Sequence, residues 1–399
     1  MTGLPIYLDH HATTPVDDRV LNAMLPHFRE QFGNAASRGH AFGKAARDAV
    51  DQSRAEVAGL LGCDPREIVF TSGATESDNL AISGVARGRR KEGAHIVTLR
   101  TEHKAVLDTC AALEREGWRI SYLDVDDQGL VSVDAVAAAL TEETVLISVM
   151  LANNEIGVAQ PIAEIGAVAR DHGVLFHCDA AQGLGYLPLS TRDVDLVSIS
   201  GHKMYAPKGV GALYVRSSVA EQGIPAPQIH GGGHEGGMRS GTLNVPGIVG
   251  LGAAAAIMAN EGSEEAVRIA RLRDSLRDRL LGEIPETRLN GAAAPRHPGN
   301  LNMSFRYVDG ATLLLELADH VAVSSGAACS SATAGPSYVL GALGVPPEEA
   351  TASVRFGLGR TTTTRDVELA GDAVIEIVGR LRSRSPLWRR RTQEKPIDW

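Results

Sequence analysis

The 399-residue sequence is poor in cysteine, and its four cysteines are not spaced in pairs. They form no CxxC motif and no zinc-like spacing, and a disulfide framework is not expected in a chain of this size. Cys63, Cys110 and Cys178 lie in apolar or helical surroundings, which favours buried structural cysteines. Cys329 differs, because it lies in a run of small residues, 324–335 (SSGAACSSATAG).

The sequence also lacks an excess of basic residues and a long apolar run. Its formal net charge of −9 argues against non-specific nucleic-acid binding, which requires a basic surface. No apolar run approaches the length of a membrane span, and residues 1–14 lack the charged segment and apolar core of a signal peptide. We therefore expect a cytoplasmic protein that binds neither a membrane nor nucleic acid directly.

The composition that remains, 44% hydrophobic and 22% charged, is typical of a soluble globular protein with room for two domains. Helical patterns alternate with short apolar strands between about residues 45 and 215. We expect helices at 45–61, 75–86, 103–116 and 162–172, and strands at 68–70, 96–99, 145–150, 174–178 and 196–199. This alternation predicts an α/β fold with a mainly parallel central sheet flanked by helices.

A polar helical segment, 261–281, is expected to lead into a smaller α+β domain. Strands are predicted there at 300–305 and 353–356, and helices at 310–317 and 366–381. The charged tail, 386–399, is expected to be irregular. We place the large domain at residues 15–260 and the small domain at residues 1–14 and 261–399, with a mobile loop at 324–336.

A polar cluster follows each of the five predicted strands of the large domain. Ligands of open parallel α/β sheets bind beyond the carboxyl ends of the strands, so these clusters are predicted to share one edge. They are residues 71–77 (TSGATES), 100–103 (RTEH), 151–157 (LANNEIG), 179–182 (DAAQ) and 200–203 (SGHK). Each cluster alone is also compatible with an ordinary helix-capping loop.

The residue types in these clusters suit a phosphorylated aromatic aldehyde. Residues 72–75 open a helix whose N–H groups and dipole favour an anion, and the hydroxyls of Thr75 and Ser200 add donors. Asp179 follows a buried strand and requires a cation such as a protonated pyridine nitrogen, unless it caps the next helix. His103 can stack on a ring and move protons, or it can cap a helix.

Three further side chains complete this chemical set. Asn154 and Gln182 can hydrogen-bond a ring oxygen. Lys203 is either a solvated turn lysine or an amine that forms a Schiff base with an aldehyde. The phosphate motif is weak by itself because it lacks the GxGxxG or Walker spacing. Taken together, the acid, the phosphate cup, the histidine and the lysine predict pyridoxal 5′-phosphate as cofactor.

The chain resembles the cysteine desulfurases of the NifS/IscS type from about residue 6 to residue 388. The order and number of the matching segments carry this resemblance more than any one of them. The segments are 6–9 (IYLD), 12–15 (ATTP), 70–79 (FTSGATESDN), 101–104 (TEHK), 153–157 (NNEIG), 200–203 (SGHK), 230–235 (HGGGHE), 239–242 (RSGT) and 324–326 (SSG).

The resemblance implies a homodimer with the fold of the pyridoxal-phosphate transferases of type I, which removes sulfur from L-cysteine and leaves L-alanine. Lys203 and His103 would be catalytic, and Arg355 would bind the substrate carboxylate with help from Asn154 and Asn34. The implied cofactor-binding residues are Ala74, Thr75, His103, Asn154, Asp179, Gln182, Ser200, His202, Lys203 and, across the dimer interface, Thr242.

Cys329 resembles the nucleophile that takes the sulfur as a persulfide. The residues support this role, because a thiolate that collects and then delivers sulfur needs a loop rather than a rigid element. Six extended residues reach roughly 20 Å, enough to travel between pocket and surface. The acceptor would be an iron–sulfur scaffold or another protein, serving cluster assembly or tRNA thiolation. Cys329 is a candidate transient cluster ligand, and no other metal site is expected.

Three segments depart from the family pattern: 9–11 (DHH), 327–331 (AACSS, where relatives often have SACT) and the tail 388–399. The alternatives are a selenocysteine lyase, another enzyme of this fold such as an aminotransferase, and a catalytically silent subunit. An aminotransferase has no use for a thiol on a mobile loop. A silent subunit would be expected to have lost Lys203, Asp179 or Cys329, and all three are present.

Overall fold

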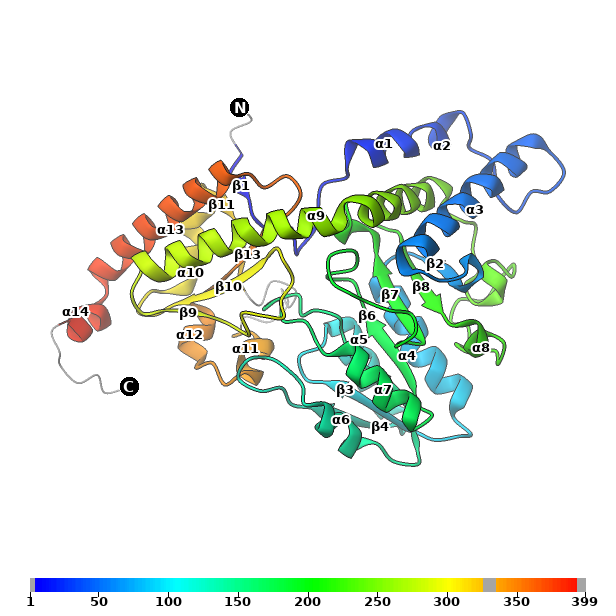
Figure 1. Ribbon diagram of the computed structural model, residues 1–399, viewed down its shortest axis with the longest axis horizontal. Coiled ribbons are helices and arrows are strands. Elements are labelled where there is room, and N and C mark those ends of the chain that lie inside the picture. The colour runs from blue at the N-terminus through cyan, green and yellow to red at the C-terminus, as the bar shows by residue number, and fades with distance from the viewer. Residues whose placement is uncertain (1–3, 326–334, 393–399) are drawn as a thin grey trace.

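The computed structural model describes residues 4–325 and 335–392. Figure 1 shows two parts connected by one long helix, α9 (Val245–Glu283), with the larger part built around a twisted sheet. The smaller part contains both the first strand, β1 (Ile6–Tyr7), and the last helices of the chain (Figure 1).

The central sheet has seven strands in the order β2-β8-β7-β6-β5-β3-β4. β8 runs antiparallel to both of its neighbours, and the other pairs are parallel, so the mainly parallel sheet is confirmed. The strands are β2 (Ile68–Thr71), β3 (His95–Leu99), β4 (Arg119–Leu123), β5 (Thr144–Ser148), β6 (Leu175–Asp179), β7 (Leu196–Ser200) and β8 (Gly211–Val215).

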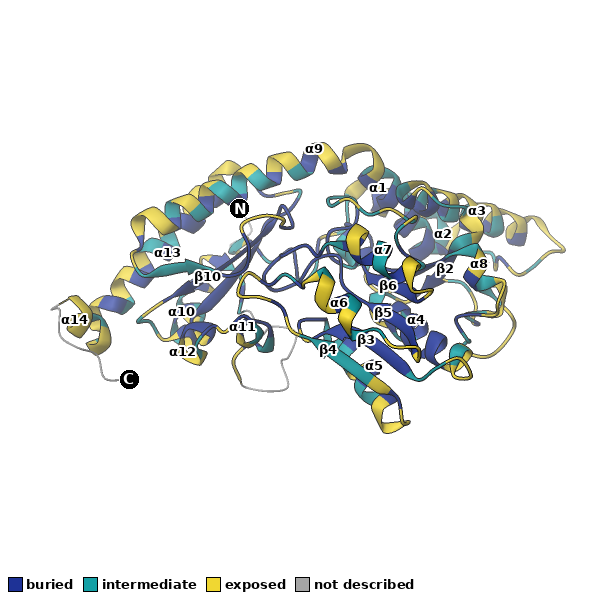
Figure 2. Cartoon of the chain, turned by 60° about the horizontal axis from the view of Figure 1, so that its bottom comes forward, coloured by how far each residue is buried: buried dark blue, intermediate teal, exposed yellow. Residues whose placement is uncertain are grey.

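Six of the seven strands are buried along their whole length, because helices cover both faces of the sheet (Figure 2). Alternate residues enter two different apolar clusters: Val97 and Ile147 pack on one face, and Ile96 and Leu146 on the other. The exception is the edge strand β4, whose residues are exposed or half-buried. Its mixed sequence, RISYL, lacks the continuous apolar run by which the other strands were predicted.

The four helices predicted for the large domain are present with bounds shifted by at most a few residues. The helices of this part are α1 (Asp18–Met24), α2 (Pro26–Arg29), α3 (Ala41–Leu61), α4 (Ala74–Arg89), α5 (Lys104–Arg115), α6 (Val133–Ala139), α7 (Ile162–Asp171) and α8 (Ser217–Ala220). Two 3₁₀ turns, η1 (Pro65–Glu67) and η2 (Gly201–Lys203), directly precede β2 and follow β7.

The smaller part packs helices against a four-stranded antiparallel sheet, β12-β13-β10-β9, and a two-stranded parallel pair, β1 with β11. Its strands are β9 (Thr287–Leu289), β10 (Asn300–Phe305), β11 (Val321–Ala322), β12 (Ser324–Ser325) and β13 (Ser353–Gly357). Its helices are α10 (Gly310–Leu317), α11 (Tyr338–Ala342), α12 (Pro347–Thr351), α13 (Thr364–Arg384) and α14 (Pro386–Thr392).

The prediction of an irregular tail from residue 386 is wrong for its first seven residues, which form helix α14. Pro386 occupies the first turn of α14, where its missing N–H is not needed. The Trp388 ring packs 5.6 Å from the Tyr307 ring, and the Arg382 guanidinium lies 4.6 Å from the Trp388 ring centre. These tertiary contacts stabilise a segment whose charged sequence gives no helical signal.

Helix α9 begins well before the predicted segment 261–281 and enters two apolar cores. Its first half, including Leu251, packs with the sheet, and its second half, including Leu276, packs in the smaller part. Leu8 packs in the same core as Leu276. The division into residues 15–260 and residues 1–14 with 261–399 stays a prediction, because Val339 and Leu340 of the smaller part pack in the core of the sheet.

Among the described residues, α9 alone contains a stretch long and apolar enough to cross a membrane. Of that stretch 56% is buried inside the protein, as in the core helix of a globular fold. Its length and composition are therefore weak evidence for a membrane span. Cys110 and Cys178 are buried and Cys63 is partly buried, and all three are free thiols. Burial raises the pKa of the Cys110 thiol to about 12, which suits an inert structural cysteine.

We predict that Leu276→Ala lowers the free energy of unfolding by roughly 2 to 5 kcal/mol, because Leu276 is fully buried and its truncation leaves a cavity. Leu281→Ala, on the same helix at 40% exposure, should cost less than about 1 kcal/mol. Urea unfolding followed by circular dichroism checks both. Equal costs for the two variants would contradict the assignment of α9 to the core of the smaller part.

Candidate functional site

A cavity of about 470 Å³ lies at the edge where the parallel strands end. It receives side chains from the segments after β2, β3, β5, β6 and β7, the five polar clusters of the sequence. The predicted site residues that line it are Ala74, Thr75, His103, Asn154, Asp179, Gln182, Ser200, His202 and Lys203. Residues without a predicted role also line it: Ala12, Ser72, Gly73, Glu76, Met150, Ala152, Ala181, Lys208 and Gly209.

The first turn of α4 forms one wall of the cavity. Gly73 is the N-cap residue, has φ +149° and provides no side-chain cap. A Cβ atom on Gly211 of the adjacent strand β8 would lie 2.6 Å from the Gly73 Cα, so glycine is required for this close approach. The helix therefore begins with small residues that let an anion reach its N–H groups, beside the side chains of Thr75 and Ser200.

Lys203 is the last residue of the 3₁₀ turn η2, directly after β7. Its Nζ donates hydrogen bonds to the carbonyl of His11 and, at 3.0 Å, to the carbonyl of Ala12. His202 Nδ1 lies 3.1 Å from Thr13 Oγ1, and burial lowers the pKa of His202 to about 4. Lys203 is therefore held by the N-terminal segment rather than solvated in a surface turn.

Asp179 is the last residue of β6 and is 4% exposed. One of its carboxylate oxygens accepts a hydrogen bond of 2.9 Å from the Ala181 N–H, so it also caps the next turn. Burial raises its pKa, whereas the hydrogen bond from the Ala181 N–H and the positive charge of Lys203 lower it. A cationic ligand placed against Asp179 would remove the cost of burying this carboxylate.

His103 is both a helix cap and a residue of the cavity. Its Nδ1 accepts a hydrogen bond of 3.2 Å from the Ala105 N–H at the start of α5. An accepting Nδ1 carries no proton, so the proton of the neutral ring lies on Nε2. The two interpretations of His103 are thus compatible, and the cap fixes the tautomer.

Gln182 is oriented by the segment that departs from the family pattern. Its Oε1 lies 3.0 Å from His11 Nδ1, and its Nε2 donates to the His11 carbonyl at 3.1 Å. The His11 ring packs edge-on to the His297 ring at 4.6 Å between ring centroids. Burial keeps the pKa of His11 well below its usual value, so the ring is neutral. His11 therefore has a structural role in orienting Gln182.

A layer of buried polar groups that was not predicted from the sequence lies behind Asp179. His177 Nδ1 lies 2.9 Å from Ser148 Oγ, and His177 Nε2 lies 2.9 Å from Ser198 Oγ and 3.6 Å from a carboxylate oxygen of Asp78. Burial lowers the pKa of His177 to about 3 and raises that of Asp78 well above its usual value. Polar residues inside fully buried strands, such as His177 and Ser198, were the available signal.

Three predicted site residues do not line the cavity, and a fourth lies outside the described residues. Arg355 is buried behind the cavity, donating to the Asn154 carbonyl at 2.9 Å and to Asp9 at 3.0 Å. Asn34 and Thr242 are exposed and absent from the lining. Cys329 lies outside the described residues.

Glu155 is a further residue to which the sequence analysis gave no role. Its carboxylate accepts a hydrogen bond from Ser337 Oγ, and Asn300 and Asn302 donate to its carbonyl at 3.2 and 3.1 Å. Burial raises the pKa of Glu155 to about 7, although the Ser337 hydrogen bond and the charge of Arg355 lower it. Glu155 thus links the segment 153–157 to the smaller part of the protein.

Most of the chain matches a known protein family and named relatives. The sequence model of the family described as aminotransferase class-V matches residues 6–369. A curated protein named cysteine desulfurase IscS, from Anaeromyxobacter sp. (strain Fw109-5), is 55% identical over 387 residues, which cover 96% of this chain and 95% of that protein. IscS from Shewanella sp. (strain ANA-3) is 52% identical over 389 residues, covering 96% and 95%.

Two solved structures are similar over nearly the full chain. One is described as a NifS-like protein and matches with a TM-score of 0.87 at 37% identity, covering 95% of this chain and 100% of that one. The other, described as SspA in complex with cysteine, matches with a TM-score of 0.80 at 37% identity, covering 90% and 100%.

We predict that Glu155→Gln changes how stability depends on pH. The pKa of Glu155 is about 7 in the folded protein and near 4.5 normally, so the folded state binds the proton more tightly. The stability that this tighter proton binding adds is fully present below the unfolded-state pKa of Glu155. It is lost as the pH rises through the folded-state pKa, and the loss is at most about 3 kcal/mol. Glutamine stays neutral and keeps the acceptor for Ser337, so the variant avoids this loss.

Urea unfolding of the wild type and of Glu155→Gln should therefore give similar free energies at about pH 5, and a variant more stable by roughly 2 kcal/mol at about pH 8.5. The exposed Glu164→Gln on α7 serves as the matched control and should behave as the wild type does at both pH values. A difference between Glu155→Gln and wild type that does not change with pH would contradict the prediction.

Proposed function

The chain belongs to the class-V aminotransferase family, and we propose that it is a cysteine desulfurase. The enzyme would convert L-cysteine and the Cys329 thiol into L-alanine and a Cys329 persulfide. One C–S bond breaks, one S–S bond forms, and no external oxidant is needed. The observation that carries the proposal is the cavity in which Lys203, Asp179 and His103 meet at the α4 N-terminus, in a chain 55% identical to a protein named cysteine desulfurase IscS.

The residues of the cavity fit pyridoxal 5′-phosphate. Lys203 supplies an amine for the aldehyde, and the buried carboxylate of Asp179 suits a pyridinium nitrogen. The N-terminus of α4 with Thr75, Ser200 and His202 suits the phosphate, and Ala74 adds backbone contact. When bound, the cofactor supplies an electron sink that weakens bonds at the substrate α-carbon.

The roles proposed for individual side chains follow from their contacts. His103 holds its proton at Nε2 and can exchange it at the cavity wall. Asn154 and Gln182 offer amide groups for hydrogen bonds to a ring oxygen. Arg355 Nε is buried without a hydrogen-bond partner among the described residues, which leaves one donor for a substrate carboxylate. Asn34 is the weakest candidate, because its side chain accepts a hydrogen bond from the Ala36 N–H at the surface.

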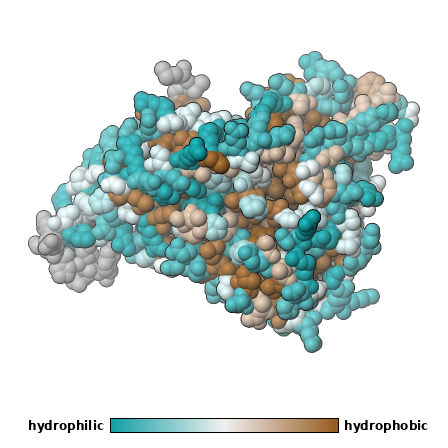
Figure 3. Space-filling model, in the orientation of Figure 1, coloured by the Kyte–Doolittle hydropathy of each residue, from teal (hydrophilic) through white to brown (hydrophobic). Residues whose placement is uncertain are grey.

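We further propose that the protein is a homodimer. Five large apolar side chains are exposed along α1, α2 and the start of α3, and Figure 3 shows pale brown surface at the upper right, where these helices project in Figure 1. They are Leu21, Leu25, Phe28, Phe32 and Phe42, at 42%, 51%, 58%, 64% and 52% exposure. Exposed aromatic clusters of this kind mark protein interfaces. Thr242, absent from the cavity of its own chain, is proposed to reach the cavity of the second copy.

The acceptor of the sulfur is proposed to be an iron–sulfur scaffold or another sulfur-binding protein, consistent with the IscS name of the relatives. Cys329 remains a candidate transient ligand of a cluster. The cytoplasm is the proposed location. These three statements rest on family membership rather than on contacts within the cavity.

We predict that the purified protein releases L-alanine from L-cysteine in the presence of a thiol reductant, together with an equal amount of sulfide. Lys203→Ala should lose roughly 10²- to 10⁴-fold in kcat, and Cys329→Ser should lose alanine release and the persulfide together. Lys44→Ala, at an exposed lysine of α3 paired with Asp48, is the control and should match the wild type. Wild-type alanine release by Cys329→Ser would remove Cys329 from the mechanism.

Borohydride reduction followed by peptide mass spectrometry identifies the lysine that holds the cofactor. A cofactor-loaded wild type that releases no alanine would preserve the cofactor assignment and overturn the substrate. Selenocysteine and amino-group transfer would then be assayed on the same preparation, which separates the remaining enzymes of this fold.

We predict that Phe32→Asp shifts the protein from dimer to monomer, because a buried charge at an interface costs several kcal/mol. Sedimentation velocity measures the shift. Leu315→Asp, at an equally prominent leucine on α10 with 75% exposure, should leave the dimer intact. Dissociation of the Leu315→Asp variant with retention of the Phe32→Asp dimer would place the interface on the smaller part instead.

A further inference from the structure

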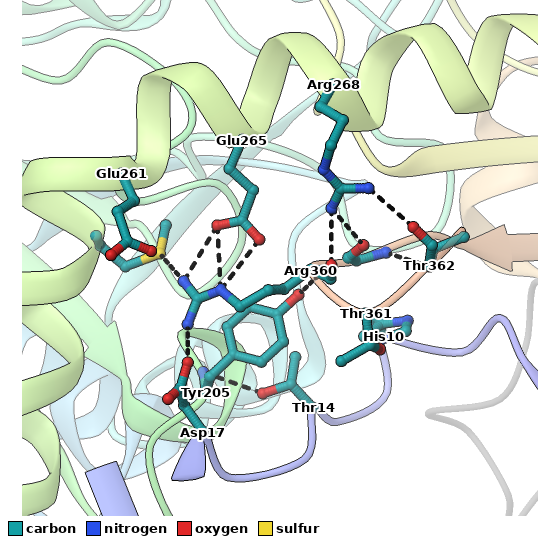
Figure 4. Close-up of polar contacts among 12 residues, drawn as sticks. His10, Thr14, Asp17, Tyr205, Glu261, Glu265, Arg268, Arg360, Thr361 and Thr362 are labelled. Carbon is teal, nitrogen blue, oxygen red and sulfur yellow. Dashed lines mark hydrogen bonds and ion pairs between the residues drawn. The ribbon is translucent and has the colours of Figure 1, made fainter. Parts of the chain in front are cut away.

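The loop after β13 reaches across to the turn that carries Lys203. In this loop the Arg360 guanidinium stacks on the Tyr205 ring, with Cζ 4.2 Å from the ring centre. The backbone N–H of Arg360 donates to Tyr205 Oη at 2.5 Å (Figure 4). A Cβ atom on Gly359 would lie 2.5 Å from Tyr205 Oη, so glycine is needed for this contact. Tyr205 is 3% exposed and lies two residues after Lys203.

The Arg360 side chain is fixed by two carboxylates from different parts of the chain. Its Nη1 donates to Asp17 at 2.7 Å, and its Nε donates to Glu265 of α9 at 3.1 Å (Figure 4). The side chains of Asp17 and Glu265 are only 10% and 8% exposed. Arg268 adds a hydrogen bond of 2.7 Å to the Arg360 carbonyl. Arg360 is therefore held in place by contacts other than the one with Tyr205.

Tyr205 adopts a backbone conformation that a large side chain rarely takes, with φ +64°. Such a conformation costs of order 1–3 kcal/mol and persists only where surrounding contacts impose it. The contacts are present: the Tyr205 N–H donates to Thr14 Oγ1 at 3.0 Å, and its carbonyl accepts from the Asp17 N–H at 3.0 Å. Arg360 constrains the ring from the other side.

The same Thr14 hydroxyl also donates to the His202 carbonyl at 3.0 Å. Thr14 thus connects the residue before Lys203 with the residue two positions after it. The direction of the Lys203 side chain, whose Nζ reaches the Ala12 carbonyl at 3.0 Å, follows from the backbone of this turn. A change in the Tyr205 backbone would rotate the turn and move Nζ within the cavity.

We propose that Arg360 and Tyr205 are positioning residues that aim Lys203 at the cofactor aldehyde. Together with Thr14 they form what we call the clamp. Through the clamp, the position of the smaller part of the protein sets the direction of the Lys203 side chain. The proposal rests on the proposed function in one respect, namely that Lys203 is the lysine that reacts. Neither Arg360 nor Tyr205 lines the cavity, so both act through Lys203 rather than on the substrate.

Two conservative variants test the clamp without removing its charge. Tyr205→Phe removes only the hydroxyl that accepts from the Arg360 N–H, and the ring remains for stacking. Arg360→Lys keeps a cation for Asp17 and Glu265 and loses the planar group that covers the ring. The controls are Arg66→Gln, which breaks the ion pair of an 86% exposed arginine with Asp64 away from the clamp, and Tyr122→Phe, which removes a hydroxyl at the far sheet edge.

The first measurement is hydrogen–deuterium exchange in the cofactor-free protein. The amides of Met204, Tyr205 and Ala206 donate hydrogen bonds within the turn or to Thr14, so their exchange reports on its order. In Tyr205→Phe and Arg360→Lys these amides should exchange about tenfold faster, as expected for the loss of roughly one hydrogen bond. The rest of the chain and the urea midpoint should be nearly unchanged.

The second measurement uses the loaded enzyme. The pH midpoint of the visible absorption of the bound cofactor should shift in both variants, because the bond to Lys203 is held at a different angle. The kcat for alanine release should fall roughly 10- to 100-fold, with KM within about twofold of wild type. The double variant should lose little more than either single variant, because both act through the same turn.

Each outcome decides something. Wild-type exchange and an unshifted absorption midpoint in both variants would overturn the clamp. Faster exchange throughout the chain, with a lower urea midpoint, would also overturn it, since the residues would then be structural only. If the wild type does not bind the cofactor at Lys203, the proposed function fails, and the exchange comparison still decides whether the clamp orders the turn.

Discussion

The burial of a carboxylate at the end of a strand is the constraint on which the site depends. Asp179 lies almost without solvent at the carboxyl end of β6, and burial raises its pKa. A protein tolerates such a group only with positive charge nearby, and Lys203 provides it. The same arrangement suits the cofactor we propose, because a ligand with a cationic ring and a phosphate would meet Asp179 at one end of the cavity and the α4 N-terminus at the other.

The N-terminal segment, residues 9–17, connects this site with the rest of the molecule. Its carbonyls hold Lys203, its Asp9 pairs with Arg355, and its Asp17 pairs with Arg360. It therefore touches both arginines that come from β13 and the loop after it. The cavity of the larger part is shaped by residues whose positions are set from the smaller part.

Much of the fold followed from the sequence because its signals are local. Apolar runs such as 196–199, bounded by polar clusters, predicted the strands and the shared edge. The cavity lining, including Asp179 and Lys203, followed from the rule that ligands bind beyond the carboxyl ends of parallel strands. The tail was mispredicted because α14 is stabilised by Trp388 stacking, which no local pattern reveals. Likewise, His11 orients Gln182 and Arg360 contacts Tyr205 although each pair is far apart in the sequence. These roles therefore become visible only in three dimensions.

Strand β1 has a consequence for the order in which the protein can be assembled during synthesis. Ile6 and Tyr7 pair in parallel with Val321 and Ala322 of β11, so β1 leaves the ribosome long before the strand that it pairs with. Domains generally fold as units from the N-terminus, and here the larger part can form while β1 is still unpaired. The smaller part is complete only when two segments far apart in the sequence have paired, and no contiguous segment contains the whole smaller part without the larger one inside it.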